Sequence, residues 1–352
     1  MAAMKLALWN VRPAWFVALI ASVGLVALLA VMAPDGGPTP APDRPDESAT
    51  DSEIAQFFDS VGAVASRRDG AGAADLFDPD RLYREATAAL PVPRPDPRGP
   101  ARVLDAVWDG FASGWLGSGW SETRLRRIDR LPGGAEVVVL ARHRTPAGVV
   151  PARWWLVRRD GRWRAYDLED VRVGLRLSHQ LTAVAAVQVG EQDHAELGSA
   201  LKAMTAASAE LAAGDAAGAA RALEPARAAR LPAPHRAILC LTEAAVALEL
   251  NDPEAALNWA DQADRARPGI PGTGLVRAVA YHRQHKWAAA AAAATPYVEA
   301  LGPDTRASLV LGLSLLELGR RAEAVEVLRA AAAEDPGHAG LSDALRRGTD
   351  PR

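Results

Sequence analysis

Few residues in this 352-residue chain have the types and spacing that chemistry requires. His282 and His285 stand three residues apart on a predicted helix and could share a metal ion, but two ligands do not complete a site and the sequence offers no third. Cys240 is the single cysteine, which excludes an internal disulfide and cysteine-cluster metal sites, and its leucine neighbours indicate a buried, inert thiol. HExxH, GxSxG, GxxxxGK(S/T) and GxGxxG motifs are missing from the sequence. We therefore expect no metal, no cofactor and no enzymatic activity.

Arginine is concentrated in one part of the chain. The region from Ser121 to Gln180 carries 13 arginines against 7 acidic residues, a local charge of +6 (13 − 7), although the formal charge of the whole chain is −3. Arginines interleaved with tryptophans would suit single-stranded nucleic acid. The location predicted below counts against nucleic acid, so we expect a solvated sheet face or, functionally, an acidic partner or anionic lipid headgroups.

The N-terminal part predicts a membrane anchor. The run Ala14–Ala33 is uncharged and long enough to cross a bilayer as a helix. Lys5 and Arg12 precede the run and acidic residues follow it, so the positive-inside rule makes residues 1–33 a cytoplasmic tip and transmembrane helix. A cleaved signal peptide is the alternative; its apolar core would be shorter, and Pro34 directly follows the candidate cleavage site. The predicted location is a bacterial cell membrane, single-pass, with the bulk of the chain extracytoplasmic.

The elements after the anchor change from helical to extended. Residues 34–52 are rich in proline and acids and predict a disordered linker. Helical spacing of apolar residues then predicts helices over 53–68, 71–90 and 101–113. Alternating segments bounded by Pro-Gly-Gly, Pro-Ala-Gly and Asp-Gly predict four strands over 123–130, 135–144, 149–159 and 162–170. The order predicts an α+β domain over 53–180, with three helices and an antiparallel sheet.

The last predicted hairpin, Arg153–Asp170, has a long strand, an Asp-Gly turn and a second strand that begins with Trp163. This hairpin and the layout of the elements resemble the nuclear transport factor 2-like superfamily, a cone-shaped α+β fold, over about Glu53–Gln180. In members with isomerase activity, the resemblance implies an acid in a hydrophobic cone, with a tyrosine or a second acid as oxyanion donor. The candidates for these roles here are Asp167, Glu169, Asp170, Tyr166 and His143.

Strand alternation argues against chemistry in this hairpin. It puts Asp167 and Glu169 on one face of the last strand, and Tyr166 and Asp170 on the other. No acid–tyrosine pair is then built into the hairpin, and pairing of the acids with arginines at a sheet edge is the simpler interpretation. Because a fold of this kind does not determine function, an isomerase-like or ligand-binding cone remains the alternative. A cone filled by tryptophans would favour a scaffold, and a pocket with converging acid, tyrosine or histidine would favour an enzyme.

The C-terminal half contains an internal sequence repeat. Proline recurs at positions 234, 268, 303 and 336, a spacing of about 34 residues. Small residues at fixed places, clearest at Leu311-Gly312, Gly319 and Ala324, resemble the tetratricopeptide (TPR) repeat. Residues 190–352 are therefore predicted to form an all-α TPR solenoid. Its parts are a degenerate helix pair over 195–213 and 216–230, the repeats 237–270, 271–304 and 305–338, and a capping helix over 341–347.

The TPR resemblance implies a groove, lined by the first helix of each repeat, that binds a protein or peptide partner. Lys and Asn of the carboxylate-clamp type are replaced by Leu241 and Ala245, so we expect an apolar helix or an extended segment as ligand. In the alternative, many of the groove leucines pack against neighbouring repeats or the capping helix. The expected function is a membrane-anchored extracytoplasmic scaffold or adaptor without catalysis. The groove residues carried over by position are Leu248, Glu249, His282, Arg283, Arg306, Leu316 and Glu317.

Overall fold

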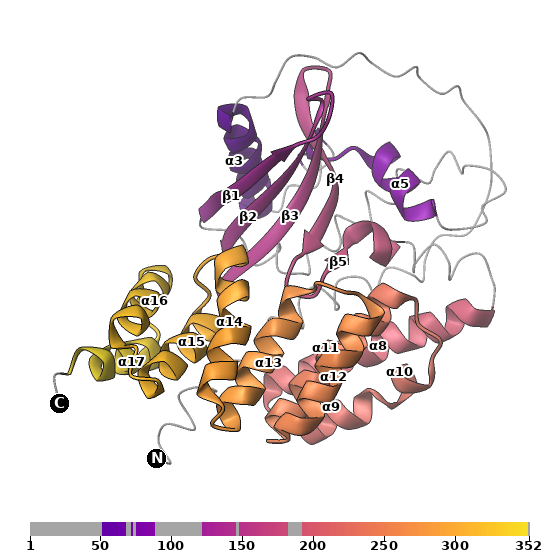
Figure 1. Ribbon diagram of the computed structural model, residues 1–352. Coiled ribbons are helices and arrows are strands. Elements are labelled where there is room, and N and C mark those ends of the chain that lie inside the picture. Colours follow the sequence, from indigo (N-terminus) through magenta and orange to yellow (C-terminus); the bar gives the residue numbers. More distant parts are fainter. Residues whose placement is uncertain are drawn as a thin grey trace. The chain divides into compact units, whose positions relative to one another are not determined.

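The structure is a computed structural model, and it describes residues 51–67, 72, 75–88, 122–145, 148–181 and 192–350 (Figure 1). The predicted anchor at 14–33, most of the linker at 34–52 and the predicted helix at 101–113 lie outside these residues. Within the described ranges, no helix combines the length and the apolar character that a membrane span requires. The chain divides into two compact units. We call them the sheet unit, which contains the strands, and the helical unit, which contains Arg172–Gly174 and the described residues from Ala206 onward.

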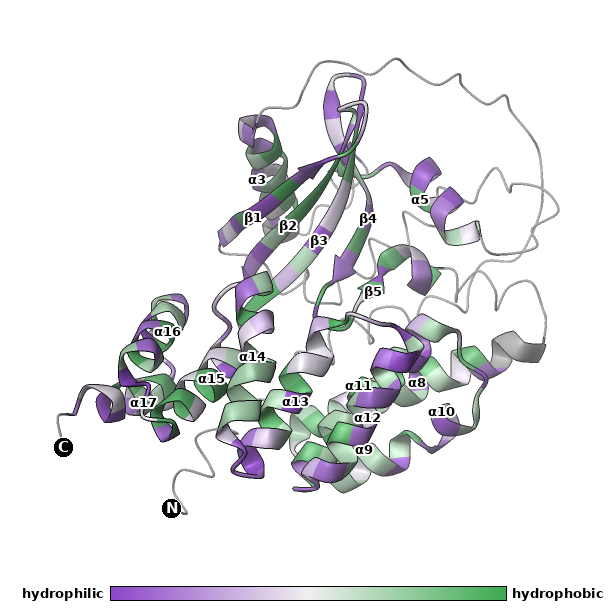
Figure 2. Cartoon of the chain, viewed as in Figure 1, coloured by the Kyte–Doolittle hydropathy of each residue, from purple (hydrophilic) through white to green (hydrophobic). Residues whose placement is uncertain are grey.

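The described part of the sheet unit contains a five-stranded antiparallel sheet in the order β1-β2-β3-β4-β5. The four predicted strands are confirmed within two residues at each end. The fifth strand was not predicted, because two residues are too few to show a period. Figure 2 shows hydrophobic and hydrophilic residues alternating along the longer strands. The strands are β1 Glu122–Arg130, β2 Glu136–Thr145, β3 Gly148–Arg159, β4 Arg162–Asp170 and β5 Leu175–Arg176.

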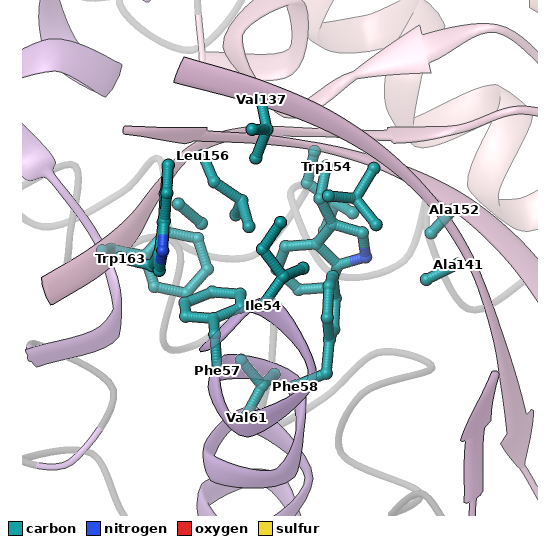
Figure 3. Close-up of a cluster of buried hydrophobic side chains, with 14 of the residues drawn as sticks. Ile54, Phe57, Phe58, Val61, Val137, Ala141, Ala152, Trp154, Leu156 and Trp163 are labelled. Carbon is teal, nitrogen blue, oxygen red and sulfur yellow. The ribbon is translucent and has the colours of Figure 1, made fainter. Parts of the chain in front are cut away.

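Two helices accompany this sheet. Helix α3 (Asp51–Arg67) confirms the first predicted helix, and its apolar stripe packs on one face of the sheet. The second predicted helix is interrupted: residues 72, 75 and 76 are helical, Phe77 then bridges to Ala165 of β4, and α5 (Pro79–Thr87) begins after its cap Asp78. Figure 3 shows the side chains of α3 and those of the strands pointing toward one another. The core contains Ile54, Phe57, Phe58, Val61, Val137, Trp154, Leu156 and Trp163.

The helical unit is a succession of antiparallel helix pairs. Each helix from α11 to α17 packs on the next, and the first helix of each pair also contacts the first helix of the following pair. The predicted capping helix is α17. The elements are α8 Gln192–Ala213, which begins before the unit boundary, α9 Ala216–Ala222, α10 Glu224–Ala228, α11 Ala233–Glu249, α12 Pro253–Ala266, α13 Pro271–Arg283, α14 Trp287–Leu301, α15 Thr305–Glu317, α16 Arg321–Glu334 and α17 Ala339–Thr349.

The turn inside each pair has the same backbone geometry. A residue in the left-handed conformation follows each first helix at the same place in successive repeats, with φ of 60° at Asn251, 58° at His285 and 75° at Gly319. The following N–H bonds back to a carbonyl five residues earlier, as in a Schellman motif, at 2.8–2.9 Å. Gly214, between α8 and α9, has φ of 84° and the same bond pattern. The backbone thus repeats even where the turn sequence does not.

Small residues also recur where paired helices meet. Ala256, Ala290 and Ala324 occupy equivalent positions of successive repeats, and each is fully buried in the second helix of its pair. Gly312 of α15 faces Leu328 of α16, and a Cβ at Gly312 would lie 2.5 Å from Leu328 Cγ. Small side chains therefore set the close approach of the helices, as the sequence pattern predicted.

Candidate functional site

The seven predicted groove residues do not form one continuous exposed surface. Leu248 is only 2% exposed and packs with Val279 of α13 and Val310 of α15. The expectation that Leu248 is an exposed contact residue is therefore wrong, because neighbouring first helices cover it. The alternative, that the leucines pack against neighbouring repeats, holds at this position.

Leu316 and Glu317 face the capping helix. Leu316 packs against a cluster that includes Leu341 and Ala344 of α17. Glu317 pairs with Arg347 of the same helix, with 2.8 Å between Oε1 and Nη2. These two residues therefore contribute to the C-terminal end of the array, as the capping-helix alternative anticipated.

The remaining four residues are half-buried polar groups on three successive first helices. We call them the first-helix wall: Glu249 at the end of α11, His282 and Arg283 at the end of α13, and Arg306 at the start of α15. Arg283 is held in place by its Nη1, which donates to the carbonyl of Leu248 near the end of α11. The wall is therefore anchored to the backbone of the array.

Three charges of the wall act on one another. Burial raises the pKa of the Glu249 carboxyl to about 7, although Arg306 and Arg283 favour its ionised form. Burial, assisted by the charge of Arg306, lowers the pKa of Arg283 to about 10, and burial also lowers the pKa of Arg306. The common cause is desolvation, which penalises the charged form of each group. These three residues form the charged trio of the wall.

His282 does not add a charge at neutral pH. Its Nδ1 lies 3.0 Å from Ser314 Oγ of α15, and its ring meets Trp287 edge to face at 4.9 Å between centroids. Burial lowers the pKa of His282 to about 4. His285 contacts the same Trp287 ring, also at 4.9 Å. Within the described residues, no group of three or more His, Cys, Asp or Glu side chains converges in a way that could hold a metal ion.

In the sheet unit, the histidine candidate His143 is part of the core. It is fully buried; Trp154 Nε1 donates to its Nε2 at 2.9 Å, and its Nδ1 lies 3.0 Å from Thr123 Oγ1. Burial lowers the pKa of His143 to about 3, so the ring is neutral. Both ring nitrogens serve hydrogen bonds inside an aromatic core, which is the arrangement of a satisfied structural histidine.

The predicted alternation along β4 fails at Tyr166. Trp155 pairs with Asp167 and Leu156 pairs with Ala165, so Tyr166 is an extra residue in β4. Tyr166 packs with Trp155 and Val157, on the face that Trp155 shares with Asp167. The expectation that Tyr166 and Asp167 lie on opposite faces is therefore wrong, because a β-bulge shifts the period by one residue.

Tyr166 has an acidic partner that the sequence did not reveal. Its hydroxyl donates to Glu136 Oε2 at 3.0 Å, while Arg81 donates to both Glu136 oxygens at 2.6 and 2.9 Å and stacks on the tyrosine ring. Burial opposes ionisation of Glu136, but the hydrogen bonds from Arg81 and Tyr166 outweigh it and hold its pKa below the ordinary value. Burial raises the pKa of Tyr166. Glu136 is therefore an ionised carboxylate that accepts three hydrogen bonds. It has the character of a structural ion-pair partner and not of a general base with a pKa near neutral pH.

The acidic candidates of β4 are buried. Asp167 accepts hydrogen bonds from Leu168 N, Ser178 N and Ser178 Oγ, the last at 2.7 Å, and lies 3.7 Å from Arg176. Burial raises the pKa of Asp167. Glu169 pairs with Arg153 at 2.6 Å, and Asp170 is 3% exposed. Pairing with neighbouring arginines, the simpler interpretation, holds for Asp167 and Glu169.

The sequence reasoning missed Arg81 and Glu136. They are 55 residues apart, and neither belongs to a local motif. Glu136 begins β2 two residues after Gly134, and only the registers of β2 with β3 and of β3 with β4 could have placed it near Tyr166.

Comparison of the chain with models of known protein families, with curated proteins and with solved structures gives no match.

Proposed function

We propose that this protein is a non-enzymatic scaffold whose TPR-like helical unit binds a partner protein at the first-helix wall. The observation that carries the proposal is the recurrence, in each repeat, of the same turn geometry and the same buried small residue. An array of equivalent helix pairs aligns its first helices, so that side chains from several repeats can meet one extended ligand.

The composition of the wall supports binding rather than catalysis. Glu249, Arg283 and Arg306 come from three successive pairs and are half-buried. A carboxyl group and guanidinium groups in partly desolvated positions provide directional polar contacts, which determine orientation and specificity at an interface. The apolar part of this surface is smaller than the sequence predicted, because Leu248 is buried.

In this proposal the sheet unit is nuclear transport factor 2-like and serves as a structural module. Trp154, Phe57, Phe58 and Trp163 fill the space between α3 and the sheet (Figure 3). Aromatic side chains in this place favour the scaffold over the isomerase-like alternative, by the criterion set from the sequence. His143 supports the same assignment, since both of its ring nitrogens are engaged.

The membrane location is part of the proposal and rests on the sequence of residues 14–33. Alkaline carbonate extraction should leave the chain in the membrane, and a C-terminal reporter should be active only outside the cytoplasm. A double change, Leu25→Lys with Leu28→Lys, is the control, because each charge near the bilayer centre costs about 2.5–3.5 kcal/mol of insertion free energy. Release of the unaltered chain into the soluble fraction would contradict the anchor.

Site-specific photo-crosslinking of the full-length chain in membranes tests the binding surface. A photoreactive residue at Ala245 of α11 or Val276 of α13 should crosslink to a discrete partner, since both positions are half-buried on first helices. Matched probes at Asn258 of α12 and Arg329 of α16 are exposed on second helices and should not. Crosslinks of equal yield from both sets would place the interaction elsewhere.

A further inference from the structure

The start of α13 lacks the cap that the start of α15 has. In α15, the Asp304 side chain accepts hydrogen bonds from two N–H groups of the first turn, at 3.0 and 2.9 Å. The equivalent position one repeat earlier is Ile270, whose side chain caps no N–H. Because Pro271 has no N–H, Gly272 carries the first donor of α13, and the helix needs an acceptor from elsewhere in the chain.

A backbone carbonyl supplies that acceptor. The Gly272 N–H donates to the carbonyl of Arg172 at 3.0 Å. The segment Arg172–Gly174 follows β4 in the sequence and belongs to the helical unit, so this contact lies within one compact unit. Leu241 of α11 borders the same place, since its Cδ1 lies 3.5 Å from the position of a Cβ at Gly272. The segment is therefore docked where two successive first helices, α11 and α13, meet.

Two glycines fit the segment to this place. A Cβ at Gly272 would overlap the carbonyl oxygen of Arg172, so glycine on the helix lets the segment approach. Gly174 has φ of 66°, and a Cβ there would lie 3.2 Å from Ile270 Cγ1 and from Arg267 Cζ. The two residues before Gly174 are only half-buried, so the segment lies on the surface of the helices and not in their interior.

We propose, on the basis of the function proposed above, that Arg172–Gly174 is an internal ligand of the helical unit and that an extended segment of the partner protein takes the same position. The partner segment presents a backbone carbonyl to the Gly272 N–H and a glycine two residues later. Gly272 is the equivalent of Arg306 one repeat earlier, so the site continues the first-helix wall by one repeat. The partner binds there only after the internal segment leaves, which makes the contact autoinhibitory.

The internal segment competes because it is attached to the chain. An attached ligand acts at an effective concentration, which is on the order of 1 mM for a short flexible tether. A free segment that binds the empty site with a Kd of about 0.1 mM is then weakened about tenfold by the internal one.

Trypsin cleavage measures release of the segment, because the protease cleaves after arginine. In the full-length protein in detergent micelles, Gly272→Ala sets a methyl group against the Arg172 carbonyl and gives α13 a better helix former. Cleavage between Arg172 and Val173, identified by mass spectrometry, should become about tenfold faster. Gly337→Ala, where a Cβ has no neighbour within 4 Å, is the matched control and should leave the rate unchanged.

A fluorescent nonapeptide with the sequence of residues 168–176 tests the site itself. Gly174→Val in the protein disfavours the left-handed backbone of the internal segment and leaves α13 intact, so the peptide should bind this variant about tenfold more tightly than the unaltered chain. Adding Gly272→Ala should abolish that binding, and the same peptide carrying Gly174→Ala should bind neither chain. In the unaltered chain, excess nonapeptide should speed hydrogen exchange of Arg172–Gly174, a readout that needs no folded variant.

An unchanged cleavage rate in Gly272→Ala would overturn the internal ligand. Peptide binding that survives Gly272→Ala, or hydrogen exchange that excess peptide does not change, would overturn the shared site. The photo-crosslinks from Val276 separate this inference from the proposed function. Their yield should rise in Gly174→Val; an unchanged yield would overturn the autoinhibition alone, whereas no crosslink in any variant would count against the proposed function as well.

Discussion

His143 in the sheet unit and Glu249 in the helical unit are both titratable groups with restricted access to water. They differ in the hydrogen bonds and ion pairs that surround them. The histidine ring contacts the rings of Phe58 and Trp154, and both of its nitrogens take part in hydrogen bonds. The carboxyl stands on a wall of repeated helices near two cations, without a contact ion pair to the described residues. One unit uses its polar groups to specify its own core, and the other presents some of its polar groups on a surface.

This difference follows from how each unit is stabilised. The sheet unit brings distant segments together, so side chains such as Arg81 and Glu136 find partners 55 residues away. The helical unit repeats a local contact between paired helices, and small residues recur at that contact. In the helical unit, changes of side-chain size should therefore have the largest effect on the free energy of unfolding. In the sheet unit, changes of hydrogen bonding should have the largest effect.

The largest expected effect on the free energy of unfolding is at the contact between Gly312 and Leu328. Leu328→Ala removes a fully buried side chain and should cost about 2–5 kcal/mol of unfolding free energy. Gly312→Ala should cost about 1–3 kcal/mol by overpacking, because its new Cβ meets Leu328. The double variant recreates the alanine pair present one repeat earlier at Ala278 and Ala294. Its loss of unfolding free energy should be smaller than the sum of the two single losses by about 1 kcal/mol or more.

Equilibrium denaturation of the full-length chain, followed by far-ultraviolet circular dichroism, measures this cycle. Additive effects within error would mean that Gly312 and Leu328 are not the steric pair that the repeat register implies. Ser342→Ala, on the exposed side of α17, is a control expected to change little.

Two tryptophans of one core provide the next comparison. Trp154 Nε1 donates to His143, whereas Trp163 Nε1 is buried without a partner among the described residues. Trp154→Phe leaves a buried acceptor unpaired and should cost about 1–3 kcal/mol more than Trp163→Phe, since both remove a similar volume. Denaturant titration of both variants checks this. Equal losses would show that packing alone, without the hydrogen bond, accounts for the role of Trp154.

The sequence located the strands well because each signal was local. Turn residues such as Asp160-Gly161 lie where the chain adopts positive φ, and Val, Trp and Leu alternate between them. The bulge at Tyr166 could not be predicted from the sequence, because it depends on the register of β4 against β3 and has no residue signature of its own. One shifted residue changed which candidates share a face.

In the helical unit, the repeat period predicted the helices and turns but not the exposure of the first-helix leucines. The period specifies equivalent positions, whereas exposure depends on what each repeat packs against. Leu316 meets the capping helix and Leu248 meets neighbouring first helices, although both occupy the same place in the repeat. Glu249 and Arg306 of the predicted groove are half-buried in the structure, and their role in binding stays a prediction.

The smallest expected effect is the pH dependence of stability that Glu249 causes, and it tests how far this carboxyl group is desolvated. Its pKa is about 7 in the folded chain against an ordinary value of 4.5, so folding takes up a proton between these two pH values. Its contribution to stability is therefore present below about pH 4.5 and is lost as the pH rises through 7. Glu249→Gln lacks this loss, so its stability relative to the unaltered chain should increase from pH 5 to pH 8. Because the group is half-exposed and screened, the increase should be about 1 kcal/mol or less.

Melting temperatures at pH 5 and pH 8 measure this increase, with Glu326→Gln, an exposed acid of α16, as the control. A pH-independent difference would mean that Glu249 is solvated like any surface acid, and the contrast with His143 would then rest on burial alone.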